Sequence, residues 1–253
     1  MNKLFVFLPC YNEEDNIGLL IEEWMKQKDK LAGSGLELLV RPIDDCSKDG
    51  TKKIIEEKAA LYPDNVALIA HEVNKNLRGG LNTGIGYFVE NAGENDLMAF
   101  MDGDNTHDPK YIHSMIEKLR SENLDCVIAS RYCSDSGVVG VAAHREFFSD
   151  MAKVYYSFML RVPGVKDYTC GYRVYNYSSI SSLVNKYGSE PVKEKSFACM
   201  MEFLYKLHLC GAKFGEVGFE LRYDNKLGES KMNVFKTAKD SLKTAVKLRF
   251  SEK

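Results

Sequence analysis

Short apolar runs alternate with amphipathic helical patterns through the first half of the chain, and this alternation constrains the fold most. The apolar runs are rich in Val, Ile and Leu, each is followed by a polar turn, and they occupy residues 4–8, 36–43, 66–70, 97–101 and 124–129. Helical patterns occupy the intervening residues 13–30, 49–61, 80–91 and 109–120. Because strands joined by helices form right-handed crossovers, this order predicts an α/β fold with a mostly parallel sheet flanked by helices.

The strict alternation stops after residue 135. Beyond it we expect a helix at 142–160, a short strand at 172–175, helices at 178–187 and 196–210, a strand at 214–221 and a terminal helix from about 231. A chain of 253 residues is long enough to bury one substantial core. We therefore expect one α/β domain over residues 1–230 and an appended helix over residues 231–253.

Composition excludes several classes of protein. The formal charge of -2, the pI near 6.2 and the lack of a basic run with interleaved aromatic residues in the first 220 residues argue against a nucleic-acid partner. The seven cysteines include no C-x-x-C pair, which favours reduced thiols in a cytoplasmic protein over a disulfide framework or a zinc site. No apolar stretch reaches about 18 residues, so no segment is expected to cross a membrane by itself.

Two carboxylates stand directly after the apolar run at 97–101. Asp102 and Asp104 are spaced i, i+2 across Gly103. Because the carboxyl ends of parallel strands open into one ligand crevice, this pair can hold Mg²⁺ or Mn²⁺ through oxygen ligands. Taken alone, the triplet is also typical of a polar turn that caps a helix.

Two further polar loops follow the first two predicted strands and are expected to reach the same crevice. The first loop, residues 9–14, reads P-C-Y-N-E-E, and the second loop, residues 44–51, reads D-D-C-S-K-D-G-T. Asp44 and Asp45 can accept hydrogen bonds from a base N–H and from ribose hydroxyls, and Tyr11 can line a base pocket. The D-G-T end of the second loop also suits a turn that caps the next helix, and the two readings are compatible.

The motifs P-x-Y-N-E, D-D-x-S-x-D-G-T and D-x-D occur in order at strand ends, and together they resemble the family-2 inverting glycosyltransferases of GT-A fold. The resemblance implies a nucleotide diphosphate sugar as donor. A dinucleotide-binding Rossmann protein would instead carry G-x-G-x-x-G after the first strand. The residues implied to bind the donor nucleotide are Pro9, Tyr11, Glu13, Asp44, Asp45 and Asp102, and those implied to bind the metal are Asp102 and Asp104.

The second half resembles one branch of that family, the dolichyl-phosphate mannosyltransferases and polyprenyl-phosphate glycosyltransferases. The matching segments are A-S-R-Y at 129–132, T-C-G-Y-R at 169–173 and the pattern from Arg222 to G-E-S-K at 228–231. The branch implies transfer of a hexose from GDP-mannose or a UDP-hexose to a polyprenyl or dolichyl phosphate. The implied phosphate and acceptor contacts are Arg131, Arg145, Arg222, Ser230 and Lys231, with Arg131 joining Asp102 and Asp104 as catalytic. Arg145 matches by position and spacing only, and a solvated surface charge is its alternative.

The acceptor class decides what else catalysis needs. A metal ion would neutralise the departing diphosphate, and His107 can touch that metal or orient the diphosphate. A phosphate monoester, with a second pKa of about 6, is ionised at neutral pH and needs no general base, whereas a saccharide hydroxyl needs one. The chain has no Glu-Asp dipeptide after residue 104, which favours the lipid phosphate. Glu202 is the alternative base, and a structural carboxylate is its other reading.

The terminal segment is basic in an acidic protein. From Lys231 to Arg249 six Lys and Arg residues face one Asp, a balance of +5, and apolar residues recur at helical spacing. This pattern predicts a basic amphipathic helix that either rests on an anionic membrane leaflet or packs its apolar face on the domain. The expected partners are a membrane surface or an integral membrane protein at the cytoplasmic face. Two other functions stay open: transfer to a saccharide hydroxyl, and a non-catalytic nucleotide-sugar-binding subunit.

Overall fold

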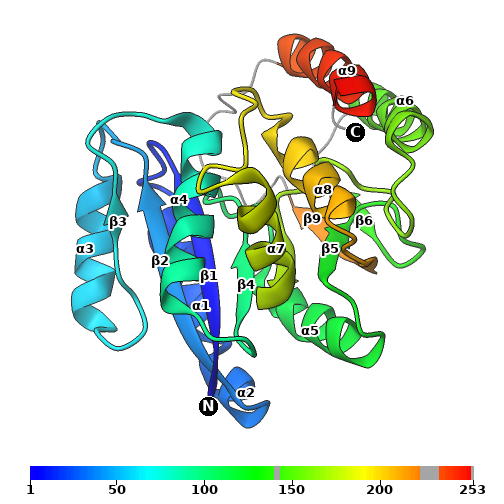
Figure 1. The fold of residues 1–253 in the computed structure, drawn as a ribbon. Coiled ribbons are helices and arrows are strands. Elements are labelled where there is room, and N and C mark those ends of the chain that lie inside the picture. The colour runs from blue at the N-terminus through cyan, green and yellow to red at the C-terminus, as the bar shows by residue number, and fades with distance from the viewer. Residues whose placement is uncertain (140–142, 223–233, 252–253) are drawn as a thin grey trace.

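The structure is a computed structural model that describes residues 1–139, 143–222 and 234–251, with side chains for all of these except 139, 143–150, 234–239 and 251. A central sheet carries helices on both faces, and the N-terminus lies at the end of the molecule away from the crevice edge (Figure 1). The predicted α/β class is confirmed. The predicted domain boundary between residues 230 and 231 lies outside the described residues and stays a prediction.

The sheet has seven strands in the order β3-β2-β1-β4-β7-β5-β8. Their bounds are β1 Asn2–Cys10, β2 Leu36–Asp44, β3 Ile69–Ala70, β4 Leu97–Phe100, β5 Cys126–Ser130, β7 Arg173–Asn176 and β8 Phe214–Gly218. Strand β7 is antiparallel to β4 and β5, and the remaining pairs are parallel. Because β1, β2 and β4 run side by side and parallel, the loops that follow them leave the sheet at one edge.

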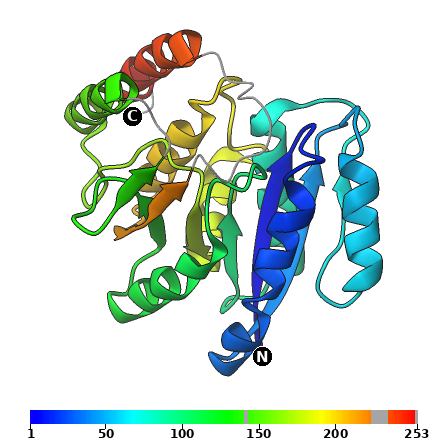
Figure 2. The same cartoon turned by 180° about the vertical axis from the view of Figure 1, so that it is seen from behind.

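Helices cover both faces of the sheet (Figures 1 and 2). One face carries α1 Ile17–Met25, α3 Thr51–Leu61, the short 3-10 turn η1 Pro109–Tyr111 and α5 Ile112–Ser121. The other face carries α4 Asn76–Asn91, α7 Tyr177–Tyr187 and α8 Cys199–Leu209. Helix α1, for example, covers the sheet with an apolar stripe of Ile17, Leu20, Ile21 and Trp24.

Two long helices lie against each other beyond α8, at the end of the molecule where the polar loops leave the sheet (Figures 1 and 2). They are α6 Ala143–Leu160 and α9 Val234–Ser251, and the Tyr155 hydroxyl of α6 donates to the Leu242 carbonyl of α9 at 3.2 Å. In the part of the chain that the structure describes, no helix is both long enough and apolar enough for a membrane span.

Three local predictions were wrong. The helix expected at 13–30 begins later, at Ile17, because the backbone N–H groups of Asn12 and Glu13 donate to the second loop instead. It also divides after Met25 into α1 and α2 Lys28–Gly33. The strand expected at 214–221 divides into β8 and β9 Glu220–Arg222, and β9 pairs with an unpredicted strand, β6 Gly137–Val139, in a separate two-stranded sheet.

The helix expected at 80–91 begins earlier, at Asn76, and two of its four glycines pack directly against the sheet. A Cβ at Gly80 would lie 2.9 Å from the Pro9 Cβ, and one at Gly84 would lie 2.6 Å from the Phe100 ring. These glycines therefore serve the close packing of α4 on β1 and β4, which outweighs their low helix propensity.

Candidate active site

The three polar loops meet at the carboxyl edge of the sheet. The Asp45 backbone N–H donates to the Cys10 carbonyl at 2.9 Å, which joins the second loop to the first. A Cβ at Gly103 would lie 3.0 Å from the Pro9 carbonyl oxygen and 2.9 Å from the Cys10 Cβ. Glycine between the two aspartates therefore lets the D-x-D loop, residues 102–109, lie directly against the first loop.

Hydrogen bonds between side chains and backbone N–H groups join the first loop to the second. The Asn12 backbone N–H donates to Ser47 Oγ at 2.9 Å, and Asn12 Oδ1 accepts from the Lys48 backbone N–H at 2.8 Å. The Glu13 backbone N–H donates to Thr51 Oγ1 at 2.7 Å. Asn12 has a φ of 54°, a left-handed conformation that Asn tolerates better than most residues. The P-x-Y-N-E and D-D-x-S-x-D-G-T motifs thus form one structural unit, and the Thr51 hydroxyl serves that unit.

The paired carboxylates of the second loop are buried and differ in their partners. Asp44 accepts from the Ser47 backbone N–H at 3.3 Å. Asp45 Oδ1 accepts from His71 Nδ1 at 2.7 Å and from the Lys75 backbone N–H at 2.8 Å. His71 is a residue of this loop cluster that the motifs do not include. A usable signal existed, because His71 directly follows the apolar run at 66–70 and so stands at another strand end.

The carboxylates of the D-x-D loop are half-buried beside the T-C-G-Y-R motif. A Cβ at Gly171 would lie 2.6 Å from Asp102 Oδ1 and 2.8 Å from Asp102 Oδ2. Glycine at this position therefore allows the chain to pass against the Asp102 carboxylate. Asp104 Oδ1 accepts from Thr106 Oγ1 at 2.7 Å, which fixes the rotamer of the second aspartate.

His107 anchors the D-x-D loop from beneath. Its Nδ1 lies 3.1 Å from Thr106 Oγ1 and its Nε2 lies 3.5 Å from Cys170 Sγ, and its ring stacks on Phe219 at a centroid distance of 5.2 Å. Burial lowers the pKa of His107 to about 4, so the imidazole is neutral at physiological pH. With both nitrogens facing protein atoms, the geometry favours a role in fixing the loop over contact with a metal.

Arg131 is held by a carboxylate that the sequence did not point to. Its Nε donates to Asp167 Oδ2 at 2.8 Å and its Nη2 to Asp167 Oδ1 at 2.7 Å, while Nη2 also reaches Thr169 Oγ1 at 2.7 Å. Burial alone would raise the pKa of Asp167, but the Arg131 guanidinium outweighs it and lowers the pKa to about 2. The forked pair fixes the plane of the guanidinium at the end of β5.

Arg222 reaches the D-x-D loop through the backbone. Its N–H donates to the Thr106 carbonyl at 3.2 Å, and its Nη1 lies 3.0 Å from Glu220 Oε1. The remaining predicted acceptor contacts, the Arg145 side chain, Ser230 and Lys231, lie outside the described residues. Of the predicted cations, the structure thus brings Arg222 to the D-x-D loop and gives Arg131 a fixed orientation.

Glu202 is committed to structural contacts. Its Oε1 lies 2.7 Å from Lys206 Nζ, and its Oε2 accepts from the backbone N–H groups of Lys193 and Glu194 at 2.8 and 2.7 Å. Both side chains of this pair are buried. The structure therefore favours the structural reading of Glu202 over the alternative base.

The aspartate pair fits a hard divalent cation that is shared with a ligand. Asp102 and Asp104 offer carboxylate oxygens, the donor type that Mg²⁺ and Mn²⁺ prefer. Among the residues that the structure describes, no group of three or more His, Cys, Asp and Glu side chains gathers into a complete metal site. Two protein carboxylates with the remaining positions left to a diphosphate and water match the way Mg²⁺ binds in phosphate-transfer sites.

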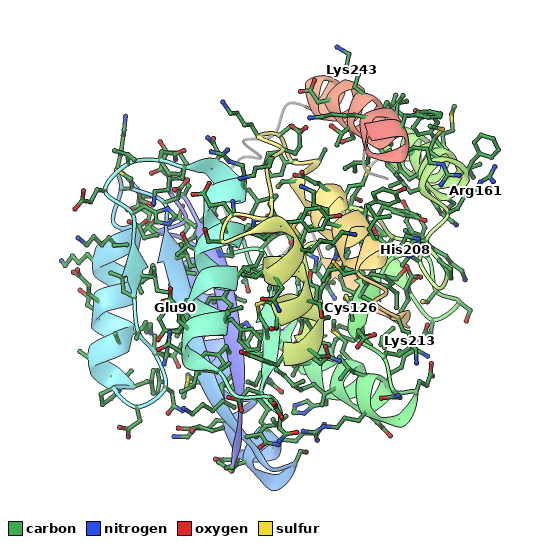
Figure 3. All side chains as sticks on the ribbon, in the orientation of Figure 1. Glu90, Cys126, Arg161, His208, Lys213 and Lys243 are labelled. Atoms are coloured by element: carbon green, nitrogen blue, oxygen red, sulfur yellow. The ribbon has the colours of Figure 1, made fainter. Side chains whose placement is uncertain are left out.

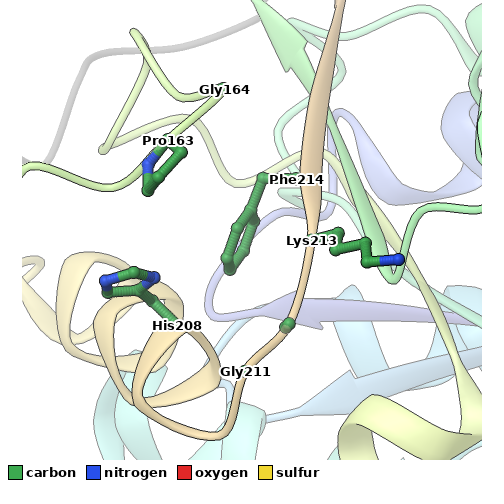
Figure 4. Close-up of a pocket in the computed structure, with 7 residues that line it drawn as sticks. Pro163, Gly164, His208, Gly211, Lys213 and Phe214 are labelled. Carbon is green, nitrogen blue, oxygen red and sulfur yellow. The ribbon is translucent and has the colours of Figure 1, made fainter.

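A hollow of about 330 Å³ lies elsewhere, at the beginning of β8 (Figure 4). Its wall includes Pro163, His208 and Phe214, and none of the predicted site residues lines it. Since the candidate residues follow the ends of parallel strands and β8 is parallel to β5, the hollow opens at the opposite edge of the sheet. It is therefore not part of the candidate active site.

Comparison with known proteins places the chain in a family. The family model described as "Glycosyl transferase family 2" matches residues 5–184. The undecaprenyl-phosphate mannosyltransferase of Micrococcus luteus is 25% identical over 91% of this chain and 88% of its own length. The polyprenol monophosphomannose synthase of Mycolicibacterium smegmatis is 26% identical over 91% of this chain and 81% of its own length.

Solved structures agree on the fold. The glucosyl-3-phosphoglycerate synthase of Mycobacterium tuberculosis, solved with Mn²⁺, UDP and glucosyl-3-phosphoglycerate, aligns with a TM-score of 0.69 at 15% identity, over 98% of this chain and 80% of that one. The mannosyltransferase PcManGT of Pyrobaculum calidifontis, solved with GDP-Man and Mn²⁺, aligns with a TM-score of 0.58 at 15% identity, over 98% of this chain and 70% of that one. With the family model covering most of the chain and the three motifs joined at one edge of a GT-A sheet, the protein belongs to glycosyl transferase family 2.

Proposed function

We propose that this protein is an inverting glycosyltransferase that moves a hexose from a nucleotide diphosphate sugar to a polyprenyl phosphate. The proposal is based on one observation: the loop that carries Asp102 and Asp104 meets the first and second loops at the carboxyl edge of the sheet. The names of the two relatives, which match over 91% of the chain, support the acceptor class.

On the donor side, Asp44 and Asp45 would read the base and ribose, with Pro9, Tyr11 and Glu13 beside them on the first loop. Asp102 and Asp104 would hold a divalent cation, Mg²⁺ or Mn²⁺, which supplies Lewis acidity for the leaving diphosphate. Asp104, fixed by Thr106, and Asp102, fixed against Gly171, would keep the diphosphate in line with the attacking oxygen. Solved relatives that contain Mn²⁺ and a nucleotide support this assignment.

On the acceptor side, the nucleophile would be the phosphate oxygen of the lipid. Because that oxygen is ionised at neutral pH, the site needs cations rather than a general base. Arg131 and Arg222 would supply fixed positive charge, together with Arg145, Ser230 and Lys231 from the segments predicted by sequence. The contacts of Glu202 with Lys206 and the Lys193 backbone agree with a site that has no general base, since they occupy the carboxylate of the alternative base.

We also propose that the enzyme docks on the cytoplasmic face of a membrane through α6 and α9. On α6, Met151, Val154 and Phe158 form an outward stripe with exposures between 56% and 67%. On α9, Leu242, Val246 and Phe250 form a second stripe with exposures from 40% to 70%. Water-exposed apolar stripes on two packed helices are typical of a surface that a membrane covers.

The charges beside these stripes indicate an anionic partner. The described side chains of α9 include Lys243, Lys247 and Arg249 against Asp240, and Arg161 follows α6. Lys243 on α9 and Arg161 after α6 project away from the body of the protein (Figure 3). In a chain whose overall charge is -2, this local excess suits an anionic lipid leaflet.

The catalytic proposal is tested by incubating the protein with Mg²⁺, labelled nucleotide sugars and a short water-soluble polyprenyl phosphate. We expect lipid-extractable label from one of the donors. Label that appears only with saccharide acceptors would favour transfer to a hydroxyl instead. Tight donor binding without turnover would favour a non-catalytic subunit.

The docking proposal is tested with the same acceptor chemistry embedded in vesicles of phosphatidylglycerol and phosphatidylcholine. The double variant Phe158→Ser, Phe250→Ser should lose vesicle binding and transfer to the embedded acceptor, while it keeps transfer to the soluble one. The matched control is Leu19→Ser, Leu61→Ser, which removes exposed apolar side chains from α1 and α3. Equal losses in both double variants would contradict the docking proposal.

A further inference from the structure

His71 is buried between the second loop and α4. Its side chain is 4% exposed and that of Asp45 is 7% exposed. His71 Nδ1 lies 2.7 Å from Asp45 Oδ1, and His71 Nε2 lies 2.8 Å from Thr83 Oγ1. Because a carboxylate only accepts hydrogen bonds, the proton resides on Nδ1, and the Thr83 hydroxyl can donate to Nε2. The imidazole is therefore held in one tautomer and one orientation.

The two oxygens of Asp45 are left in different states. Oδ1 accepts from His71 Nδ1 and also from the Lys75 backbone N–H at 2.8 Å. Since a carboxylate oxygen has two in-plane lone pairs, these two donors fill Oδ1. Oδ2 receives no hydrogen bond from the described residues, and it is not among their fully buried polar atoms that lack a partner, so it keeps a small contact with solvent.

The position of Asp45 places this oxygen at the ligand edge. Asp45 directly follows β2, and its backbone N–H is tied to the end of β1 through the Cys10 carbonyl. The Asn74 side chain donates to the Asp45 carbonyl at 3.1 Å, which closes the inner side of the loop. Asp45 therefore presents one fixed acceptor at the carboxyl edge of the sheet.

We propose that His71 is a positioning residue: it occupies one carboxylate oxygen of Asp45 and leaves the other as the single acceptor for the donor's nucleobase. As a result the site takes uracil in preference to guanine. This inference rests on the proposed function. Uracil presents one N–H between two carbonyl oxygens, which one carboxylate oxygen can accept. Guanine presents an N–H and an amino group side by side, and these require both oxygens of a carboxylate. Because His71 and Lys75 occupy Oδ1, the second of guanine's two donors finds no acceptor on Asp45.

The test is calorimetric binding of UDP and of GDP in the presence of Mg²⁺. We expect the wild-type protein to bind UDP at least about tenfold more tightly than GDP, since leaving a buried donor or acceptor unpaired costs about that factor or more. His71→Leu should weaken UDP binding by about tenfold and reduce the ratio of UDP affinity to GDP affinity, because the freed Asp45 carboxylate can turn both oxygens toward the ligand. His71→Asn, whose amide N–H can replace Nδ1–H, should restore much of the preference.

The control variant is His113→Leu, which removes a histidine whose Nε2 lies 3.0 Å from Gln27 in another part of the protein, and it should bind both nucleotides as the wild type does. Thermal unfolding checks that each variant folds, and a donor KM that rises while kcat stays constant separates positioning from general damage. GDP binding as tight as UDP binding, or an unchanged ratio in folded His71→Leu, would overturn the inference while the proposed function stands. Failure of both nucleotides to bind the wild type would overturn both.

Discussion

Gly171→Ala is the substitution that probes the site most sharply with the least change. The added Cβ would lie 2.6 Å from Asp102 Oδ1, whereas ordinary contact begins at 3.4 Å, so the carboxylate has to move by 3.4 − 2.6 = 0.8 Å. Metal–oxygen distances tolerate about 0.2 Å. A displacement approaching 1 Å costs about 10²-fold in rate, or roughly 2.7 kcal/mol of transition-state stabilisation. We therefore expect kcat/KM to fall by about 10²-fold.

The matched control is Gly86→Ala in α4, where nothing lies within 4 Å of the added Cβ. That variant should keep wild-type activity and gain about 0.5–1 kcal/mol of stability, because alanine favours a helix more than glycine does. The assay is label transfer to the soluble polyprenyl phosphate over a Mg²⁺ titration. If folded Gly171→Ala transferred sugar at the wild-type rate and Mg²⁺ dependence, the placement of Asp102 at the metal would be refuted.

Other predictions follow from the buried charges. Asp167→Asn should destabilise the protein by about 3–5 kcal/mol in urea denaturation, since it leaves the Arg131 charge without its partner. In the wild type, the Asp167 pKa of about 2 means that this pair stabilises fully above pH 4 and that the stabilisation is lost as the pH falls toward 2; a flat stability profile over that range would contradict the pairing. The His107 pKa of about 4 means that between pH 6.5 and 4 the unfolded protein binds a proton that the folded protein does not. The free energy of unfolding should therefore fall by about 3 kcal/mol as the pH is lowered from 6.5 to 4, and His107→Gln should remove this fall. Glu202→Gln should lower the melting temperature yet keep kcat within a few-fold, whereas a loss of 10² or more would identify Glu202 as the base.

The order of the fold could be predicted because it depends on periodicity and chain direction. Strands β1, β2, β4 and β5 lie where apolar runs end in polar turns, and α3, α6 and α9 fall close to their predicted ranges. The antiparallel insertion of β7 between β4 and β5 has no local signature, since it is set by which strand edge remains open after the first crossovers. The break between β8 and β9 depends equally on a second sheet that only the folded chain creates.

The site could be predicted for residues inside motifs and missed for residues that support them. Asp45 was recognised by its loop, whereas His71 pairs with it from 26 positions away along the chain. In the same way Arg131 was recognised within its motif, but Asp167, 36 positions away, was not. Such partners are chosen by three-dimensional proximity in a buried setting, where an unpaired charge is costly, and one sequence carries no record of that pairing.

In the proposed mechanism Asp102 and Asp104 hold a divalent cation against the donor diphosphate. The most direct measurement is the electron paramagnetic resonance of Mn²⁺ titrated with a nucleoside diphosphate, in the wild type and in Asp102→Asn and Asp104→Asn. We expect the wild type to bind Mn²⁺ tightly only when the nucleotide is present, and each variant to lose that coupling by tenfold or more. Mn²⁺ and nucleotide that bound all three proteins alike would contradict the account.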